Sequence, residues 1–118
     1  MRHLFIMILL TGTIVSHSPF AQGDRHCSQG LGWMTIILSR IAAAEEPSLC
    51  ATQRVELLEW VEEIKQDFRY CGCPNSESEL DKLDWPKAET AQECTLTRSD
   101  FRDEISRIQS FANDECGH

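Results

Sequence analysis

Apolar residues recur with a helical period along most of this chain. Over residues 30–46, the apolar positions lie 3, 4, 7 and 10 residues after the first, so they share one side of a helix. These positions are Met34, Ile37, Leu38, Ile41 and Ala44. Pro47 should end the helix, because proline has no backbone N–H to donate. The two-residue alternation of a half-buried strand does not occur in the sequence, so the pattern predicts an all-α fold.

The helix predicted over residues 51–70 has the clearest division between an apolar and an acidic side. The apolar side consists of Leu57, Leu58, Val61, Ile64 and Phe68, with the aliphatic stem of Lys65. The opposite side has four carboxylates at helical spacing, which we call the acidic stripe: Glu56, Glu59, Glu63 and Asp67. Gly72 and Pro74 should end this helix.

The third segment predicts short helices only. Residues 76–79, Ser-Glu-Ser-Glu, fit a capping box, which favours a helix that starts there and continues through Leu83. Pro86 should end or kink this helix near Trp85, because the residue before a proline is biased away from helical geometry. A further short helix is expected over residues 87–93.

The last segment predicts another long helix. Residues 97–100, Thr-Arg-Ser-Asp, give a helix start, and the apolar positions that follow are Phe101, Ile105, Ile108, Phe111 and Ala112. Residues 114–118 are expected to fray, apart from Cys116. The second and fourth segments should form the core, through Leu57, Val61, Ile64, Phe68, Phe101, Ile105, Ile108 and Phe111.

Six cysteines divide the chain into nearly equal parts, with 22, 20, 1, 20 and 21 residues between Cys27, Cys50, Cys71, Cys73, Cys94 and Cys116. A helix of about 20 residues is about 30 Å long, so in an up-and-down bundle successive cysteines alternate between its two ends. A disulfide needs Cα atoms within about 7 Å. Cys50 should therefore pair with Cys94 at one end.

Four cysteines share the other end of the predicted bundle. A Cys71–Cys73 bridge would close a strained ring, which leaves two pairings open. Either Cys27 pairs with Cys73 and Cys71 with Cys116, or Cys27 pairs with Cys71 and Cys73 with Cys116. The sequence thus predicts a small four-helix bundle cross-linked by three disulfides.

The order of the cysteines resembles that of the plant lipid-transfer and seed-albumin superfamily, a four-helix fold with the order C, C, CC, C-x-C, C, C. Here Cys50 stands for half of the CC pair, Cys71-Gly72-Cys73 for C-x-C, and one cysteine pair is missing. The resemblance implies that Cys50 pairs with Cys94, and that Cys71 and Cys73 take the first and last cysteines. It also implies a pocket for an apolar ligand.

The first 21 residues predict a secretory signal peptide. Arg2 precedes an apolar run of about 12 residues, which is too short to span a bilayer, and cleavage is expected after Ala21. Residues 22–118 would then form one disulfide-linked helical domain. A chain this short gains stability from disulfides, and an even number of cysteines in an exported chain favours complete pairing. We expect the protein to be secreted or periplasmic.

The chain is acidic, and this charge restricts the classes of molecule that it is expected to bind. Without residues 1–21, 10 basic residues stand against 19 acidic ones, a balance of −9. Binding to nucleic acid or to anionic lipid relies on clustered Lys and Arg, so neither is expected, nor is membrane insertion once the signal is removed. A basic protein partner suits this charge.

Candidate chemistry is sparse. The C-G-C pair, Cys71 and Cys73, could exchange disulfides, but Cys71 is expected at a helix C-terminus, where the helix dipole disfavours a thiolate. His26 and His118, with Asp24 and Glu115 nearby in sequence, could hold a divalent metal only if the two chain ends meet, and no metal or cofactor is expected.

These observations favour an exported, non-enzymatic binding protein. No serine or cysteine nucleophile has a partnering histidine within the predicted helices. The favoured function is recognition of a protein partner, as an immunity or inhibitor protein does, through the acidic stripe. The alternative is an apolar-ligand carrier with a pocket inside the bundle, for which one of Trp33, Trp60 and Trp85 would form the floor. A thiol–disulfide oxidoreductase is the third hypothesis.

Overall fold

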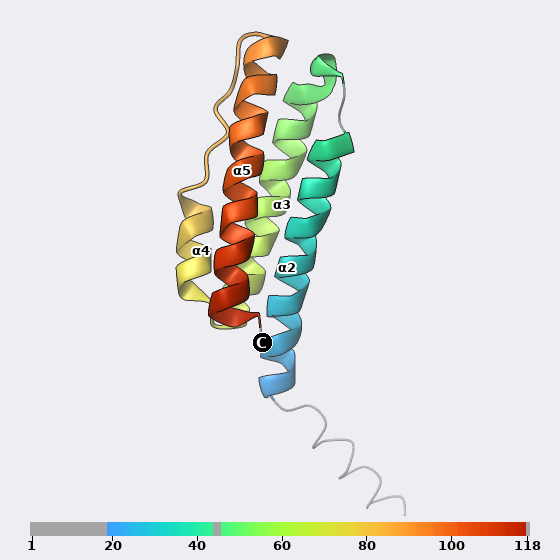
Figure 1. Ribbon diagram of the computed structural model, residues 1–118. Coiled ribbons are helices and arrows are strands. Elements are labelled where there is room, and N and C mark those ends of the chain that lie inside the picture. Colours follow the sequence, from blue (N-terminus) through green and yellow to red (C-terminus); the bar gives the residue numbers. More distant parts are fainter. Residues whose placement is uncertain (1–18, 44–45, 118) are drawn as a thin grey trace, which may run out of the picture.

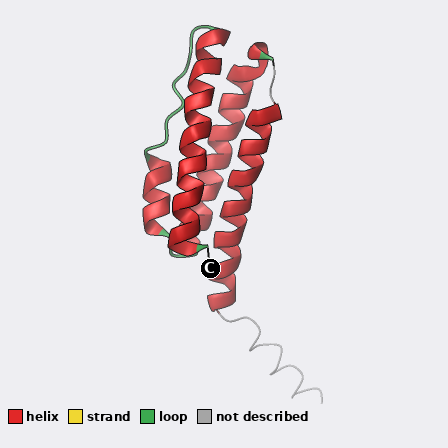
Figure 2. Cartoon of the chain, viewed as in Figure 1, coloured by secondary structure: helices red, strands yellow, loops and turns green. Residues whose placement is uncertain are grey.

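The computed structural model describes residues 19–43 and 46–117, and in these residues the chain consists of helices and loops (Figures 1 and 2). The α-helices of this described part are α2 (Pro19–Ala43), α3 (Cys50–Tyr70), α4 (Pro74–Asp81) and α5 (Ala91–Cys116), and a 3-10 turn, η1 (Pro47–Leu49), precedes α3. The predicted all-α four-helix bundle is confirmed.

The three long helices, α2, α3 and α5, pack against one another, and the short α4 lies against α3 and α5 at one end (Figure 1). The loop of residues 82–90 then follows α5 to the opposite end of the bundle. Extended backbone advances about 3.3 Å per residue against 1.5 Å in a helix, so this loop covers the distance that the short α4 leaves. Within the described residues, no helix is both long and apolar enough to cross a bilayer.

Helix α2 begins eleven residues before the predicted start at Gly30. The buried stripe of the helix continues backward from Met34 to Gly30 and Cys27, at the same helical spacing. A Cβ atom on Gly30 would lie 2.8 Å from Cε1 of Phe68, so α2 and α3 approach closely only because this residue is glycine. The predicted end at Glu46 is also wrong, because Glu46 is not helical and is the N-cap of η1, while the predicted apolar position Ala44 lies outside the described residues.

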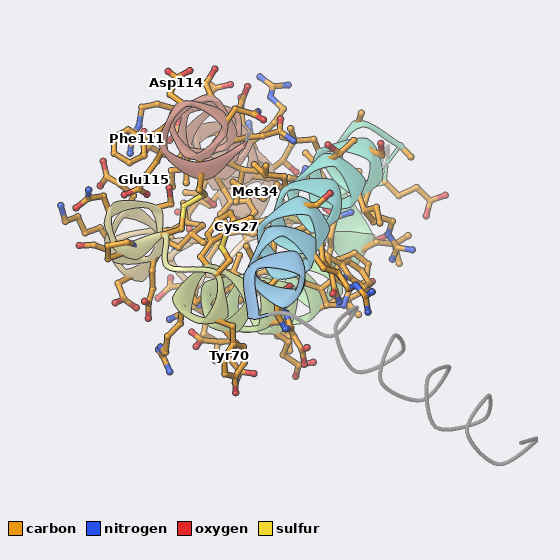
Figure 3. All side chains as sticks on the ribbon, turned by 90° about the horizontal axis from the view of Figure 1, so that it is seen from below. Cys27, Met34, Tyr70, Phe111, Asp114 and Glu115 are labelled. Atoms are coloured by element: carbon orange, nitrogen blue, oxygen red, sulfur yellow. A yellow bond between two sulfur atoms is a disulfide. The ribbon has the colours of Figure 1, made fainter. Side chains whose placement is uncertain are left out.

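The core of the bundle contains the predicted positions of α3 and α5 with one exception. Leu57, Ile64, Phe68, Ile105 and Ile108 are fully buried, and Val61 and Phe101 nearly so. Phe111, however, is 38% exposed, and the small Ala112 takes the buried position instead. Figure 3 shows Phe111 on the outer side of α5. Both residues lie at the edge of the apolar stripe, and the spacing from Ile108 allows either.

Trp85 explains why residues 87–90 are not helical, whereas residues 91–93 of the predicted short helix belong to α5. Its side chain is fully buried, its ring stacks on Phe101 with centroids 4.7 Å apart, and its Nε1 donates to Oγ1 of Thr97 at 3.1 Å. Arg54 donates from Nε to the Trp85 carbonyl. These contacts hold the backbone before Pro86 against the bundle in a non-helical conformation.

Helix α5 begins at Ala91, six residues before the predicted start at Thr97. Thr90 is the N-cap, and its Oγ1 accepts a hydrogen bond from the Glu93 backbone N–H at 3.1 Å. Oε2 of Glu93 in turn accepts from the Glu89 N–H at 3.2 Å. Residues 90–93, Thr-Ala-Gln-Glu, therefore carry the capping-box pattern that sequence analysis assigned only to residues 76–79.

Helix α4 begins at Pro74, and its N-terminus is capped by a residue from α5. Oε1 of Glu115 accepts from the backbone N–H and the hydroxyl of Ser76, at 2.8 and 2.6 Å, and its Oε2 accepts from the Asn75 N–H at 3.1 Å. Ser76 thus lies inside the helix rather than at its N-cap. Residues 114–116 are helical and are not frayed, because α4 and the Cys116 disulfide hold them (Figure 3).

Hydrogen bonding changes the titration of Glu115. Burial opposes its ionisation, but the hydrogen bonds from Ser76 and Asn75 outweigh this effect, and the pKa of the carboxyl is lowered from its ordinary value. A carboxylate that caps a helix N-terminus also interacts favourably with the helix dipole.

Glu115→Ala should therefore lower the free energy of unfolding by about 1–2 kcal/mol at neutral pH, because two N–H groups of α4 lose their acceptor. The folded-state pKa lies below the unfolded one, so this stabilisation is complete above the unfolded pKa and is lost as pH falls through the folded pKa. In urea unfolding, the difference between the two proteins should shrink toward acidic pH. Asp114→Ala, at the exposed neighbour, should change stability by under about 0.5 kcal/mol. A pH-independent difference would refute the role of the charge.

The disulfides decide between the two pairings that the spacing left open. Cys50 pairs with Cys94 at one end of the bundle, as predicted. At the other end Cys27 pairs with Cys71 and Cys73 with Cys116, with Cα atoms 5.5 and 6.0 Å apart. All six cysteines are paired. Cys71 follows α3, which packs on α2, whereas Cys73 precedes α4, whose start contacts the end of α5 through Glu115.

Candidate functional site

The acidic stripe of α3 is divided by its neighbours on α2. Oε1 of Glu56 accepts from Nη2 of Arg40 at 2.8 Å, and Oδ1 of Asp67 lies 3.3 Å from Nδ1 of His26. The two carboxylates between them, Glu59 and Glu63, are exposed, and neither forms an ion pair with another described residue. The stripe therefore has one end that is neutralised by Arg40, one end that contacts His26, and a centre with uncompensated negative charge.

Two tryptophans lie beside this centre. Trp33 of α2 and Trp60 of α3 are half-buried, and their ring centroids are 5.4 Å apart with a tilt of 59° between the planes. Together with Glu59 and Glu63 they line a cleft of about 340 Å³ that opens to solvent, which we call the tryptophan cleft. Aromatic faces next to carboxylates are the surroundings that bound organic cations use.

Arg40, a cation of the protein itself, lies at the edge of the tryptophan cleft beside Trp60. The guanidinium carbon of Arg40 lies 5.7 Å from the ring centroid of Trp60, while the same side chain pairs with Glu56. Arg40 is about half exposed, so this contact forms at the surface. It shows that the geometry of Trp60 and its neighbouring carboxylates accommodates a guanidinium.

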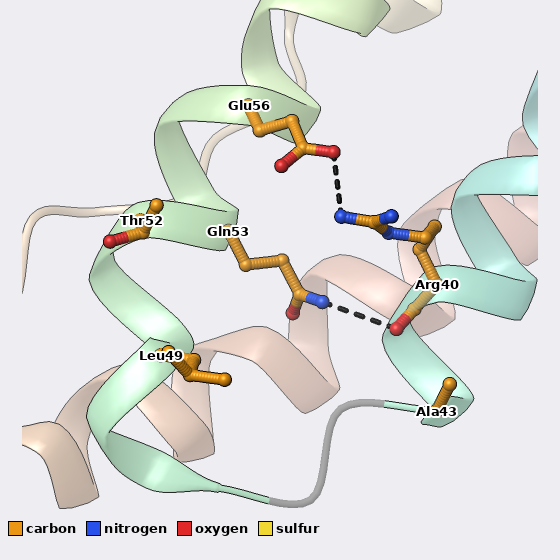
Figure 4. Close-up of a pocket in the computed structure, with 6 residues that line it drawn as sticks. All are labelled: Arg40, Ala43, Leu49, Thr52, Gln53 and Glu56. Carbon is orange, nitrogen blue, oxygen red and sulfur yellow. Dashed lines mark hydrogen bonds and ion pairs between the residues drawn. The ribbon is translucent and has the colours of Figure 1, made fainter.

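A second cleft, also of about 340 Å³, continues from Arg40 toward the end of α2 (Figure 4). Nε2 of Gln53 donates to the Arg40 carbonyl at 3.1 Å, but its buried Oε1 has no hydrogen-bond partner. Leu49, on the opposite side, is 56% exposed. We call the surface formed by both clefts the α2–α3 face, which consists of Trp33, Arg40, Ala43, Leu49, Thr52, Gln53, Glu56, Glu59, Trp60 and Glu63.

The third tryptophan does not belong to this face, because Trp85 is part of the core. Trp33 and Trp60, in contrast, are only partly buried and pack against the edge of the core. Both lie on their helix one position from a buried residue, Met34 and Val61, and so flank the buried stripe. Their pairing depends on how α2 and α3 pass each other, which the sequence of either helix does not encode.

The residues considered for a metal have other contacts. His26 lies beside Asp67, with its ring centroid 5.3 Å from that of Tyr70, and Glu115 caps α4. The Asp24 side chain and His118 lie outside the described residues. The Sγ atoms of Cys27, Cys71, Cys73 and Cys116 lie within 4.8 Å of one another. All four are used in disulfides, and a metal would require them as thiolates.

The C-G-C pair is divided between two disulfides. Cys71 is partly exposed and bonded to Cys27, whereas Cys73 is fully buried and bonded to Cys116. Gly72 takes a positive φ of 76° in the turn between them, a conformation that favours glycine. In this state the two sulfur atoms do not form the Cys71–Cys73 bridge that a two-cysteine exchange cycle would use.

Comparisons with protein-family models, with curated proteins and with solved structures find no match to this chain. The site must therefore be interpreted from its own chemistry. The three disulfides are typical of proteins in an oxidising environment.

Proposed function

We propose that this chain is an exported binding protein that recognises a basic protein partner through the α2–α3 face. The observation that carries the proposal is the tryptophan cleft, which is lined by two half-buried indoles and two exposed carboxylates. Neither carboxylate has an ion-pair partner among the described residues. A lysine or arginine side chain of the partner would enter the cleft, with its cation near Trp33 and Trp60 and within reach of Glu59 and Glu63.

The energetics favour a surface contact of this kind. Stacking of a cation on an indole contributes about 0.5–1 kcal/mol at an exposed site and about 2 kcal/mol when water is displaced. Exposed ion pairs contribute less each, but they become stronger as the partner excludes solvent. Tryptophan and arginine are the residues that most often dominate protein interfaces, and the face contains both types.

The charge of the whole chain supports the same partner class. Its formal net charge is −8, so a basic partner would be attracted over a distance comparable to the Debye length, about 8–10 Å at physiological salt. Such attraction mainly raises the association rate. An immunity or inhibitor protein, which must neutralise a target quickly, would gain from a fast association.

Export is part of this proposal. Residues 1–18 of the predicted signal peptide lie outside the described residues, and the support for export is the apolar run in the sequence together with the complete pairing of the six cysteines. We propose a secreted or periplasmic location. No catalytic step is assigned to the α2–α3 face, because its function requires only binding.

The apolar-ligand alternative would place its ligand inside the bundle. There, Trp85, Phe68 and Phe101 are buried and in contact with the remaining core. The clefts of the α2–α3 face are instead at the surface. Both are lined by charged side chains, and the tryptophan cleft adds two aromatic ones. This arrangement favours a charged protein partner over a lipid.

We expect the protein to bind a hexa-arginine peptide, and the fluorescence of the half-buried Trp33 and Trp60 to change on binding. The double substitution Glu59→Gln and Glu63→Gln should weaken the affinity by about tenfold, because it removes the uncompensated charge of the cleft. The loss should be largest at low salt.

A matched control separates this site from the overall charge. Asp100→Asn with Asp114→Asn removes two exposed carboxylates from α5, and hence the same net charge, from positions without an ion pair among the described residues. This variant should keep its affinity within about twofold. Equal weakening in both double variants would show that the peptide binds the acidic protein without a defined site.

A further inference from the structure

A third cleft lies between the C-terminal end of α2 and the N-terminal half of α5. It has a volume of about 290 Å³ and is lined by Ile41, Ala42, Thr95, Arg98, Ser99 and Arg102. It shares no lining residue with the α2–α3 face. Two of its six residues are arginines, although the chain as a whole is acidic. We call it the arginine cleft.

Arg98 is the unusual residue of this cleft. It is only 8% exposed, and its buried Nη1 has no hydrogen-bond partner. No ion pair joins it to another residue in the part of the chain that the structure describes. A charged N–H group that has lost its water without gaining a partner is unfavourable, so the unpaired Nη1 favours an anion beside this guanidinium.

The neighbouring side chains complete a positively charged site. Arg102 donates from Nη2 to Oδ1 of Asp103 at 3.1 Å and to Oγ of Ser99 at 3.3 Å. Because the Ser99 hydroxyl accepts from Arg102, its own hydrogen remains free to donate. The Asp103 carboxylate offsets one of the two guanidinium charges, and the cleft retains the other.

We propose that the arginine cleft binds a small oxyanion, a phosphate or carboxylate group, through the guanidinium groups of Arg98 and Arg102. A guanidinium presents planar pairs of N–H donors that match the oxygen atoms of these groups. The volume suits a single such group, either free or at the end of a larger molecule. This inference is independent of the proposed function, because it concerns another surface and the opposite charge.

A purely structural role for Arg98 is the rival explanation. The cleft includes Ile41 and Ala42 at the C-terminal end of α2, where the helix dipole is negative and attracts a cation. In that case Arg98 would stabilise the end of α2, and an added anion would not bind to the arginine cleft. The two explanations differ in their response to phosphate.

The test compares thermal unfolding in sodium phosphate and in sodium chloride at equal ionic strength. We expect phosphate to raise the Tm of the unmodified protein by at least about 4 °C more than that of Arg98→Met. Phosphate also stabilises proteins in general by exclusion from their surface, and the Arg98→Met variant measures that effect. Arg107→Met, at an exposed arginine nine residues further along α5, should respond like the unmodified protein. Equal phosphate responses in Arg98→Met and Arg107→Met would overturn the proposal.

Further arms identify the anion and guard against misfolding. Should Arg98→Met fail to fold, Arg102→Met removes the second guanidinium at an exposed position and should give a smaller phosphate response than Arg107→Met. Inorganic phosphate, phosphoserine and acetate, titrated separately, distinguish a free phosphate, a phosphorylated group and a carboxylate, and any Arg98-dependent response supports the site. An internal ion pair of Arg98 is tested at Glu45, the carboxylate that follows α2 in the sequence and lies outside the described residues. If Glu45→Gln destabilises the protein as much as Arg98→Met, and no anion shows an Arg98-dependent effect, an ion pair between these two residues replaces the proposal.

Discussion

Replacing Cys50 and Cys94 together by alanine should lower the free energy of unfolding by about 4 kcal/mol. The bridge closes a loop with a sequence separation of 44 residues, and a loop of that length loses about this much entropy in the unfolded chain. Neither of the other two bridges shortens the chain between Cys50 and Cys94. Small domains have a total stability of about 5–15 kcal/mol, so the variant would be marginal at 37 °C.

Urea unfolding of the double alanine variant measures this loss directly, with an m-value check that the unfolded state has expanded. The Cys27–Cys71 and Cys73–Cys116 bridges have separations of 44 and 43 residues, so their removal should cost nearly the same. A loss under about 1 kcal/mol for Cys50 and Cys94 would mean that packing alone holds that end of the bundle.

Ile64→Ala should be the most damaging of the single substitutions considered in α3, with a loss of about 2–5 kcal/mol. The Ile64 side chain is fully buried in the core, and its removal leaves a cavity that the surrounding helices fill only in part. Glu63→Ala changes the adjacent residue, which is exposed, and should cost well under about 1 kcal/mol. It could even stabilise the protein, because Glu59 and Glu63 repel each other at i,i+4 spacing.

The two variants together test which face of α3 is buried. Chemical denaturation of both, under the same conditions, gives the two free energies of unfolding for comparison. Similar losses for Ile64→Ala and Glu63→Ala would contradict the orientation of α3, and the exposed position of the tryptophan cleft would be refuted with it.

The bundle could be predicted from the sequence because its determinants are periodic. The stripe from Leu57 through Ile64 to Phe68 repeats at helical spacing, and the cysteines repeat at helix length, so burial and bridge geometry follow from counting residues. The choice between the two remaining bridge pairings depends on where α4 packs against α5, which residue spacing alone does not give.

Contacts between distant segments could not be predicted in this way. Trp85 prevents a helix after Pro86 only because Phe101 and Thr97 of another segment bind its ring. Glu115 caps α4 from 39 residues away. In contrast, the start of α5 has a local signal, the capping box of residues 90–93, which competes with the helix-start pattern at Thr97.

The candidate sites, too, could be predicted only in part. Helical spacing predicts Glu59 and Glu63 as members of the acidic stripe. It does not predict that Glu56 is paired while these two are not, because that depends on the position of Arg40. The burial of Arg98 had a signal in the sequence, since it falls at helical spacing between Cys94 and Phe101 on the buried stripe of α5. A charged residue at such a position indicates a special environment.

The central claim is that a basic partner binds at the tryptophan cleft, and amide chemical-shift mapping tests where binding occurs. The ¹⁵N-labelled protein would be titrated with hexa-arginine at low salt, so that electrostatic contacts are strongest. The account predicts that the largest shifts cluster at Trp33, Glu59, Trp60 and Glu63, including the indole N–H signals of Trp33 and Trp60 but not that of the buried Trp85. Shifts spread over the acidic residues of α5, with those two indole signals unchanged, would contradict it.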